Sequence, residues 1–176
     1  VDRAAAGTLT DEMIDRFLTL GRYARHQARA DAILFTCSAF GPAIDAVAAD
    51  LDIPVHKPNS AMIERAVALA DGGRIGLVAT FAPTLKSMPA EFPAGTDLAL
   101  IHVPGALDAA KSGNGPMHDR LAAEAAVAQD ASCTVIALSQ FSLARARGEV
   151  ARRVHKPVLV TPDCAVEAIR ACVESR

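Results

Sequence analysis

The stretch Ala32–Ala43 reads A-I-L-F-T-C-S-A-F-G-P-A and combines the signal of a short strand with the start of a helix. Its first residues are apolar and favour a buried β-strand that ends at Cys37. Gly41 and Pro42 then open an amphipathic run, and proline suits the first turn of a helix. We therefore expect Cys37 at the carboxyl end of a parallel strand, directly before a helix. Open α/β sheets bind their ligands at this place.

The helix expected after Cys37 also bears on the chemistry of the thiol. The first N–H groups of a helix have no partner inside it, and the helix dipole places partial positive charge there. Both effects favour a thiolate and a bound anion. The alternative is that Cys37 is a small buried hydrophobic residue, which is a common role of free cysteine.

Strand and helix patterns alternate along the rest of the chain. The predicted strands are residues 32–36, 53–57, 74–79, 97–103, 133–138 and 157–161. The predicted helices are residues 8–28, 42–50, 60–70, 117–129, 142–154 and 164–175, with a further helix beginning near Thr84. This alternation indicates βαβ units and parallel sheets. We therefore predict an α/β fold with small parallel sheets flanked by helices.

An internal repeat relates the two halves of the sequence. It consists of three matched segments in the same order: I-L-F-T-C-S (33–38) with V-I-A-L-S-Q (135–140), P-V (54–55) with P-V (157–158), and P-N-S-A (58–61) with P-D-C-A (162–165). The repeat predicts a first α/β lobe over residues 1–72, with the C-terminal helix 163–176 packing on it, and a second lobe over 73–162. It places Cys37 and Ser139 at equivalent positions that face one cleft.

The repeat is unequal at its start. The second lobe has two predicted strands, residues 74–79 and 97–103, before the strand that ends at Ser139, whereas the first lobe has no counterparts before Thr8. We therefore expect one or more N-terminal strands of the first lobe, roughly 30 residues, to lie outside this sequence.

Composition narrows the classes of function. Aromatic residues make up 4% of the chain, tryptophan is absent and the net charge is −2, so nothing favours binding to nucleic acid or to a membrane surface. No apolar run approaches the roughly 18 residues of a membrane span. The four cysteines show neither metal-ligand spacing nor a dense disulfide framework. We expect reduced thiols in a cytoplasmic protein and no metal site.

Three motifs together resemble the aspartate/glutamate racemase superfamily, which includes hydantoin and allantoin racemases, maleate isomerase and arylmalonate decarboxylase. They are T-C-S-A (36–39) at the first cysteine of that family, A-T-F-A-P-T (79–84) at the start of its second lobe, and L-S-Q-F (138–141) at its second cysteine. The resemblance covers essentially the whole chain. It implies two pseudo-symmetric α/β lobes with the active site between them, and chemistry that needs no metal or other cofactor.

The resemblance also implies a reaction and its residues. Loss of a proton or of CO₂ from the carbon α to a carboxylate leaves a carbanion-like intermediate, which needs donors already in place and an acid or base within reach. The expected catalytic residues are Cys37, as acid, base or nucleophile, and Ser139 at the position of the second cysteine. The expected substrate-binding residues are Ser38, Ala39, Thr80, Thr84 and Gln140. For the hydroxyl groups the alternative role is helix capping. The candidates for a proton relay are His56, His102 and His118.

Ser139 departs from the family pattern, because it stands where the second cysteine is expected. A two-base racemase removes a proton with one thiol and delivers a proton to the opposite face with the other, and an unassisted hydroxyl is a poor substitute. A racemase- or isomerase-type enzyme acting on a small carboxylate is the first hypothesis. A single-cysteine decarboxylase, a cis-trans isomerase and a small-anion binding protein without activity remain as alternatives. A homo-oligomer is also left open.

Overall fold

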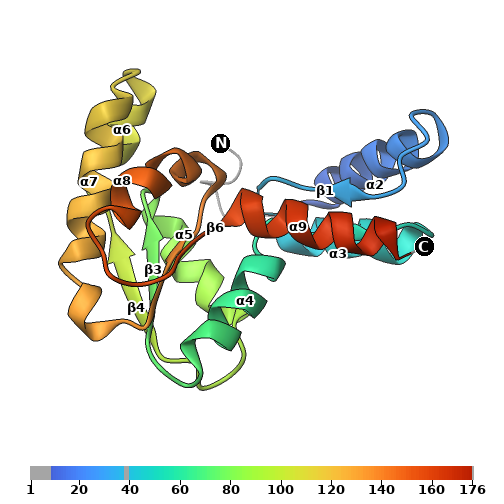
Figure 1. Ribbon diagram of the computed structural model, residues 1–176. Helices are drawn as coiled ribbons and strands as arrows, with labels where there is room; N and C mark the ends of the chain where they lie inside the picture. Colours follow the sequence, from blue (N-terminus) through green and yellow to red (C-terminus); the bar gives the residue numbers. More distant parts are fainter. Residues whose placement is uncertain (1–8, 38–39, 176) are drawn as a thin grey trace. The chain divides into compact units, whose positions relative to one another are not determined.

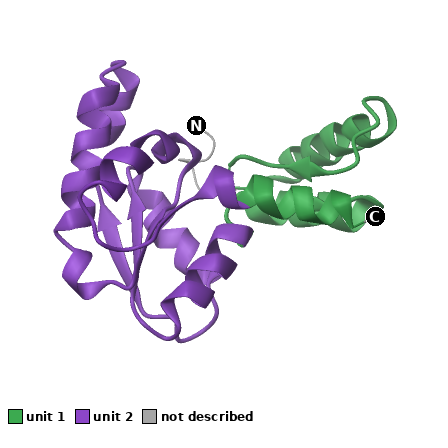
Figure 2. Ribbon diagram, in the orientation of Figure 1, with its two compact units in different colours: residues 1–60, 165–176 green, residues 61–164 purple. Residues whose placement is uncertain are grey.

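The computed structural model describes residues 9–37 and 40–175, and helices and parallel strands alternate along this part of the chain (Figure 1). The chain divides into two compact units, residues 1–60 with 165–176 and residues 61–164 (Figure 2). We call them unit 1 and unit 2. No helix in the described ranges is long and apolar enough to cross a membrane. The predicted fold class, small parallel sheets flanked by helices, is confirmed.

Unit 1 contains a sheet of two parallel strands. Its elements are α2 (Asp11–His26), β1 (Ile33–Leu34), α3 (Gly41–Asp50), β2 (Val55–His56) and, from residue 165 on, α9 (Thr161–Glu174). Ile33 pairs with Val55, and Leu34 pairs with His56. Thr10 caps α2, since its side chain accepts a hydrogen bond from the Met13 N–H.

Helices α2 and α3 pack closely against each other. The contact is made at Gly21, where a Cβ atom would lie 2.5 Å from Cγ1 of Val47. The Arg22 guanidinium adds a two-pronged ion pair to Asp50 at the end of α3, with nitrogen–oxygen distances of 2.8 and 2.6 Å. These contacts fix α2 beside the strand-to-helix segment that carries Cys37.

Unit 2 contains a sheet of four parallel strands in the order β4-β3-β5-β6. In chain order its elements are α4 (Ser60–Ala70), β3 (Ile75–Ala79), α5 (Ala82–Ser87), η2 (Met88–Glu91), β4 (Leu98–His102), α6 (Ala106–Lys111), α7 (Gly115–Val127), η3 (Asp130–Ser132), β5 (Val135–Leu138), η4 (Phe141–Ala146), α8 (Arg147–Ala151) and β6 (Val158–Val160). Register is continuous across the centre of the sheet, where Val78 pairs with Leu138 and Leu138 with Val160.

The core of unit 2 lies on both faces of this sheet. One cluster joins Val78, Ile136 and Leu138 to apolar residues of α7, η4 and α8. The other joins strand residues such as Leu77 and Ala137 to α4, α5 and η2. Successive side chains of a strand point to opposite faces, so these residues lie on the other face of the sheet. Gly76 lets the layers approach, because a Cβ atom there would lie 2.7 Å from Cδ1 of Ile136. Strands β3 and β5 are fully buried.

The observed units differ from the predicted lobes in the place of one helix. The first boundary was expected at residue 72, but α4 groups with unit 2. The reason is packing, since Met62, Ile63 and Ala66 of α4 belong to the same core cluster as Leu77 of β3. Within the described residues unit 1 has two strands and unit 2 has four, so the predicted symmetry of the lobes and their shared cleft stay predictions.

Candidate active site

Cys37 lies in unit 1, in the segment between β1 and α3, and it is exposed. The Phe35 N–H donates to the His56 carbonyl at 3.1 Å, which continues the pairing of β1 with β2 up to this segment. On either side of Cys37, Phe35 and Phe40 pack on Phe17 of α2, with ring centroids 5.2 and 5.3 Å apart. The thiol therefore reaches solvent from a segment that is anchored at both of its ends.

Helix α3 begins directly after this segment, as predicted. Phe40 occupies the N-cap position and makes no side-chain capping hydrogen bond, and a proline lies in the first turn. The N–H groups at the start of a helix are then available to an anion. Ser38 and Ala39, the two predicted binding residues in this segment, lie outside the described residues.

His56 was one of the candidates for a proton relay, and it ends the strand paired with β1. Its Nε2 is buried, and no hydrogen-bond partner for it occurs in the part of the chain that the structure describes. The other two candidates lie in unit 2, where His102 is exposed at the end of β4 and His118 is buried in α7.

The other predicted residues lie at the carboxyl edge of the sheet in unit 2. Because the four strands are parallel, the segments that follow them meet at one edge. Thr80 follows β3, and Ser139 with Gln140 follow β5. Thr84 lies half-buried in the first turn of α5, where its N–H donates to the Phe81 carbonyl at 3.0 Å.

Ser139 is buried, with 2% of its surface exposed, and its hydroxyl is engaged. Its Oγ donates to the Val78 carbonyl at 2.8 Å, and its N–H donates to the same oxygen at 3.0 Å. Thr161, which the sequence analysis missed, acts in the same way on the neighbouring strand, since its hydroxyl donates to the Leu138 carbonyl at 3.2 Å. Both hydroxyls thus bind main-chain carbonyls of the neighbouring strand, at the point where the regular strand pairing ends.

Thr80 and Gln140 are joined directly. The Gln140 side-chain oxygen accepts from the Thr80 N–H at 2.7 Å and from the Thr80 hydroxyl at 2.9 Å. Two of the predicted binding residues are thus brought into contact, and Ser139, a predicted catalytic residue, directly precedes Gln140 in the chain. Cys37 belongs to unit 1 and Ser139 to unit 2, so their predicted meeting across a cleft stays a prediction.

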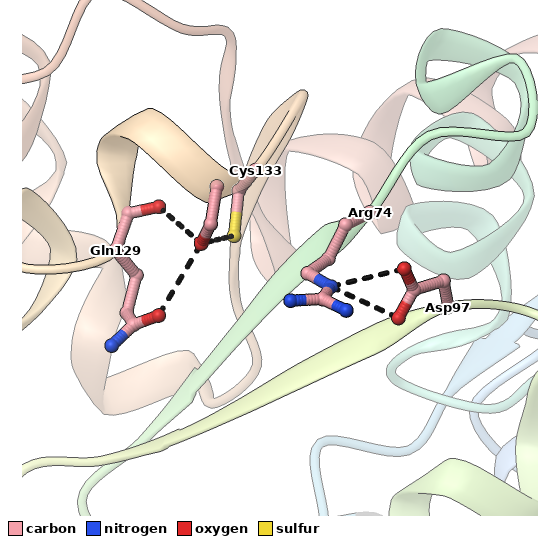
Figure 3. Close-up of polar contacts among 5 residues, drawn as sticks. Arg74, Asp97, Gln129 and Cys133 are labelled. Atoms are coloured by element: carbon pink, nitrogen blue, oxygen red, sulfur yellow. Dashed lines mark hydrogen bonds and ion pairs between the residues drawn. The ribbon is translucent and has the colours of Figure 1, made fainter.

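The opposite edge of the sheet carries contacts of a structural kind (Figure 3). Arg74 and Asp97, which precede β3 and β4, form an ion pair at 3.0 Å. Before β5, the Ser132 hydroxyl donates to the Gln129 carbonyl at 3.0 Å. A pocket of about 220 Å³ opens at this edge, between the turn at 72–73 and residues 94–97. No predicted site residue lines it.

A buried histidine and an ion pair lie together at the start of α7. His118 is 1% exposed, and its Nδ1 lies 2.9 Å from Oδ1 of Asp119. The Arg145 guanidinium, from η4, binds both oxygens of Asp119 at 2.8 and 3.1 Å. The guanidinium lies directly over Gly115, at a place that a Cβ atom would occupy. Burial raises the pKa of Asp119, but the hydrogen bonds from Arg145 and His118 outweigh burial and leave this pKa below its usual value.

Asp119→Asn is expected to destabilise the chain at pH 7, by up to about 1 kcal/mol, the range of partly exposed ion pairs. A carboxyl group whose pKa is lowered by folding stabilises above its unfolded pKa of about 3.9, and this contribution is lost as the pH falls further. Urea unfolding at several pH values measures the effect. The difference in the free energy of unfolding between parent and variant should disappear below about pH 4. A gap of equal size at pH 7 and pH 3 would contradict the assignment, and Asp108→Asn, at an exposed position of α6, is the control.

Side chains that could bind a metal ion do not cluster in the described part of the chain. Over residues 9–37 and 40–175, no three of histidine, cysteine, aspartate and glutamate lie close enough together to hold a metal ion. Asp119 and Asp97 are paired with arginine, whereas Cys37 and His102 are exposed.

Solved structures similar to this chain were found, whereas no family model and no curated protein matches its sequence. Glutamate racemase isoform RacE1 from Bacillus anthracis is similar with a TM-score of 0.71 and 12% identity, over 96% of this chain and 67% of that one. The Gly74Cys mutant of arylmalonate decarboxylase, in a sulfate-associated form, is similar with a TM-score of 0.65 and 16% identity, over 93% of this chain and 76% of that one.

A third similar structure is glutamate racemase from Thermus thermophilus in complex with beta-chloro-D-alanine. Its TM-score is 0.63 and its identity 20%, over 96% of this chain and 66% of that one. All three identities are low, so the comparisons establish a shared fold. Short motifs predicted a resemblance to the aspartate/glutamate racemase superfamily. The comparisons confirm this resemblance for the fold.

Proposed function

We propose that this chain is a cofactor-independent enzyme that acts at the carbon α to the carboxylate of a small substrate, with Cys37 as its acid, base or nucleophile. The observation that carries the proposal is the exposed thiol of Cys37, which lies in the segment between β1 and the start of α3. The shared fold supports the reaction class, because its solved examples include racemases and a decarboxylase.

The proposed chemistry needs only a thiol and hydrogen-bond donors. In a racemase-type reaction the Cys37 thiolate takes the proton from the α carbon, and the electron pair of the broken C–H bond moves into the substrate carboxylate. Donors at the start of α3 and at the carboxyl edge of the unit 2 sheet would stabilise that charge. Water or a second acid then delivers a proton to the opposite face of the carbon, and the thiol keeps the proton that it took until solvent removes it, so that neither oxidant nor metal enters the balance.

A second candidate is a single-thiol decarboxylase, and the state of Ser139 favours it. The Ser139 hydroxyl is buried and donates to Val78, which leaves it poorly placed to exchange a proton with a substrate. In that reaction CO₂ leaves with its carbon–carbon bond broken, the electron pair stays on the α carbon, and the Cys37 thiol protonates it. Only one proton donor is required.

The test is a comparison of substrates with the purified chain. D- and L-glutamate, D- and L-aspartate, phenylmalonate and maleate would be incubated with the parent and with Cys37→Ala, in the presence of a metal chelator. Chiral chromatography reports racemisation, gas release reports decarboxylation, and proton NMR reports isomerisation of maleate. We expect activity that the chelator does not change and that requires Cys37. Saturable binding of one of these acids without turnover would instead identify a binding protein.

A further inference from the structure

The orientation of the Gln140 carboxamide is determined by its neighbour. The Thr80 main-chain N–H can only donate a hydrogen bond, so the amide atom that lies 2.7 Å from it must be the oxygen. The Thr80 hydroxyl, at 2.9 Å from the same oxygen, completes the pair of donors. The amide nitrogen of Gln140 therefore points away from Thr80.

This pairing changes what each residue can offer to a ligand. Thr80 was expected to donate to a substrate carboxylate, but its N–H and its hydroxyl proton are both given to Gln140. Thr80 is also 4% exposed. The two N–H bonds of Gln140 Nε2, in contrast, find no acceptor among the residues that the structure describes. Gln140 therefore offers N–H donors at this place, whereas Thr80 does not.

The main chain on both sides of this amide is held in place. Before Gln140, the N–H and hydroxyl of Ser139 donate to the Val78 carbonyl on the adjacent strand. After it, the Leu143 N–H donates to the Gln140 carbonyl at 2.9 Å. A donor that is fixed before the ligand arrives costs little reorganisation when the ligand binds. The side-chain amide of Gln140 is such a donor, because its oxygen and its main chain are held by hydrogen bonds.

We propose that Gln140 Nε2 is the group at the carboxyl edge of the unit 2 sheet that binds a carboxylate oxygen of the ligand, and that Thr80 is a positioning residue for its amide. The identity of the ligand as a carboxylate rests on the proposed function. The assignment of donor and positioning residue rests on the two hydrogen bonds between Thr80 and Gln140.

Gln140→Glu tests the donor with nearly unchanged shape. One carboxylate oxygen can still accept both hydrogens of Thr80, but an anionic oxygen replaces Nε2 and repels the carboxylate. We expect binding of phenylmalonate and glutamate, or kcat/KM for whichever is turned over, to weaken roughly 10- to 100-fold. The thermal midpoint should change little. Gln129→Glu is the matched control, because its amide oxygen also lies near a hydroxyl, that of Ser132, but at the opposite edge of the sheet.

Thr80→Val tests the positioning role. It removes the hydroxyl donor and keeps the N–H, so the Gln140 amide loses one of its two fixed partners. We expect Kd or KM to rise a few-fold with kcat little changed, and Thr80→Ser to restore the parent value. A loss of kcat with unchanged KM, or no rescue by serine, would contradict a positioning role.

A nitrogen-15 NMR experiment makes the inference independent of turnover. The side-chain NH₂ signals of Gln140 are those that disappear in Gln140→Glu. We expect Thr80→Val to shift them in the ligand-free chain, and millimolar sodium glutamate, phenylmalonate or sulfate to shift them saturably in the parent. If these signals stay fixed while other signals move, or if no probe moves any signal, the inference is overturned. An active parent whose Gln140→Glu variant keeps its kcat/KM overturns this inference alone, whereas a chain that binds through Gln140 without turnover overturns the proposed function alone.

Discussion

Cys37→Ala is expected to lower turnover of the carboxylate substrate by about 10²- to 10⁴-fold, the range that a positioned acid or base contributes. The alanine side chain cannot take or return a proton, and the only groups left to act would be solvent and the donors that stabilise charge. The fold should persist, because the thiol is exposed and its removal costs no more than about 0.5 kcal/mol. Initial rates with the best substrate, together with circular dichroism, measure both effects.

Cys172→Ala provides the matched control for this substitution. Cys172 is a free, half-buried thiol in the part of α9 that belongs to unit 1, and no predicted motif contains it. Its replacement should leave the rate unchanged within a factor of about two, because this thiol takes no part in the proposed chemistry. Equal losses in both variants would show that a general effect on unit 1, and not the Cys37 thiol, is responsible.

Leu138→Ala should produce the largest loss of stability of the substitutions considered, about 2–5 kcal/mol. Leu138 is fully buried on β5, between β3 and β6, and packs in the cluster that joins the sheet to α7, η4 and α8. Removing three of its side-chain carbons leaves a cavity between the sheet and the helices that cover this face. Urea unfolding followed by circular dichroism gives the free energy.

Leu100→Ala is the comparison within the same sheet. Leu100 lies on the edge strand β4 and is 49% exposed, so its truncation should cost less than about 1 kcal/mol. The same loss for both leucines would contradict the burial of β5 at the centre of the sheet. Ser139 and Gln140 directly follow Leu138. The activity of Leu138→Ala therefore also shows how far the carboxyl edge of the sheet depends on the packing of the core.

The sequence pattern was sufficient for the fold class and for the order of the strands and most helices. Apolar runs such as Ile75–Ala79 and Val135–Leu138 are the buried centre of the sheet, and such runs are typical of parallel strands covered on both faces. Helix α6 was missed because Pro104 and Gly105 read as a turn. That turn exists, since Gly105 has φ 75°, but the chain enters a helix directly after it.

The contacts at the candidate site were less predictable. Thr80 and Gln140 were both named as binding residues, but their bond depends on β3 and β5 being neighbours in register, which no local pattern shows. The same holds for Asp119 and Arg145, which come from α7 and η4. The assignment of α4 to unit 2 likewise follows from tertiary packing, since a helix pattern shows an apolar face but not its partner.

The most direct test of the account is the appearance of solvent deuterium at the α carbon. The chain would be incubated in D₂O with glutamate and with phenylmalonate, and the C–H signals followed by proton NMR. A Cys37 thiol exchanges with solvent and carries deuterium, so we predict that the parent incorporates it at the α carbon and that Cys37→Ala does not. Incorporation at the same enzyme-dependent rate in both proteins, or product formed by the parent without deuterium, would contradict the account.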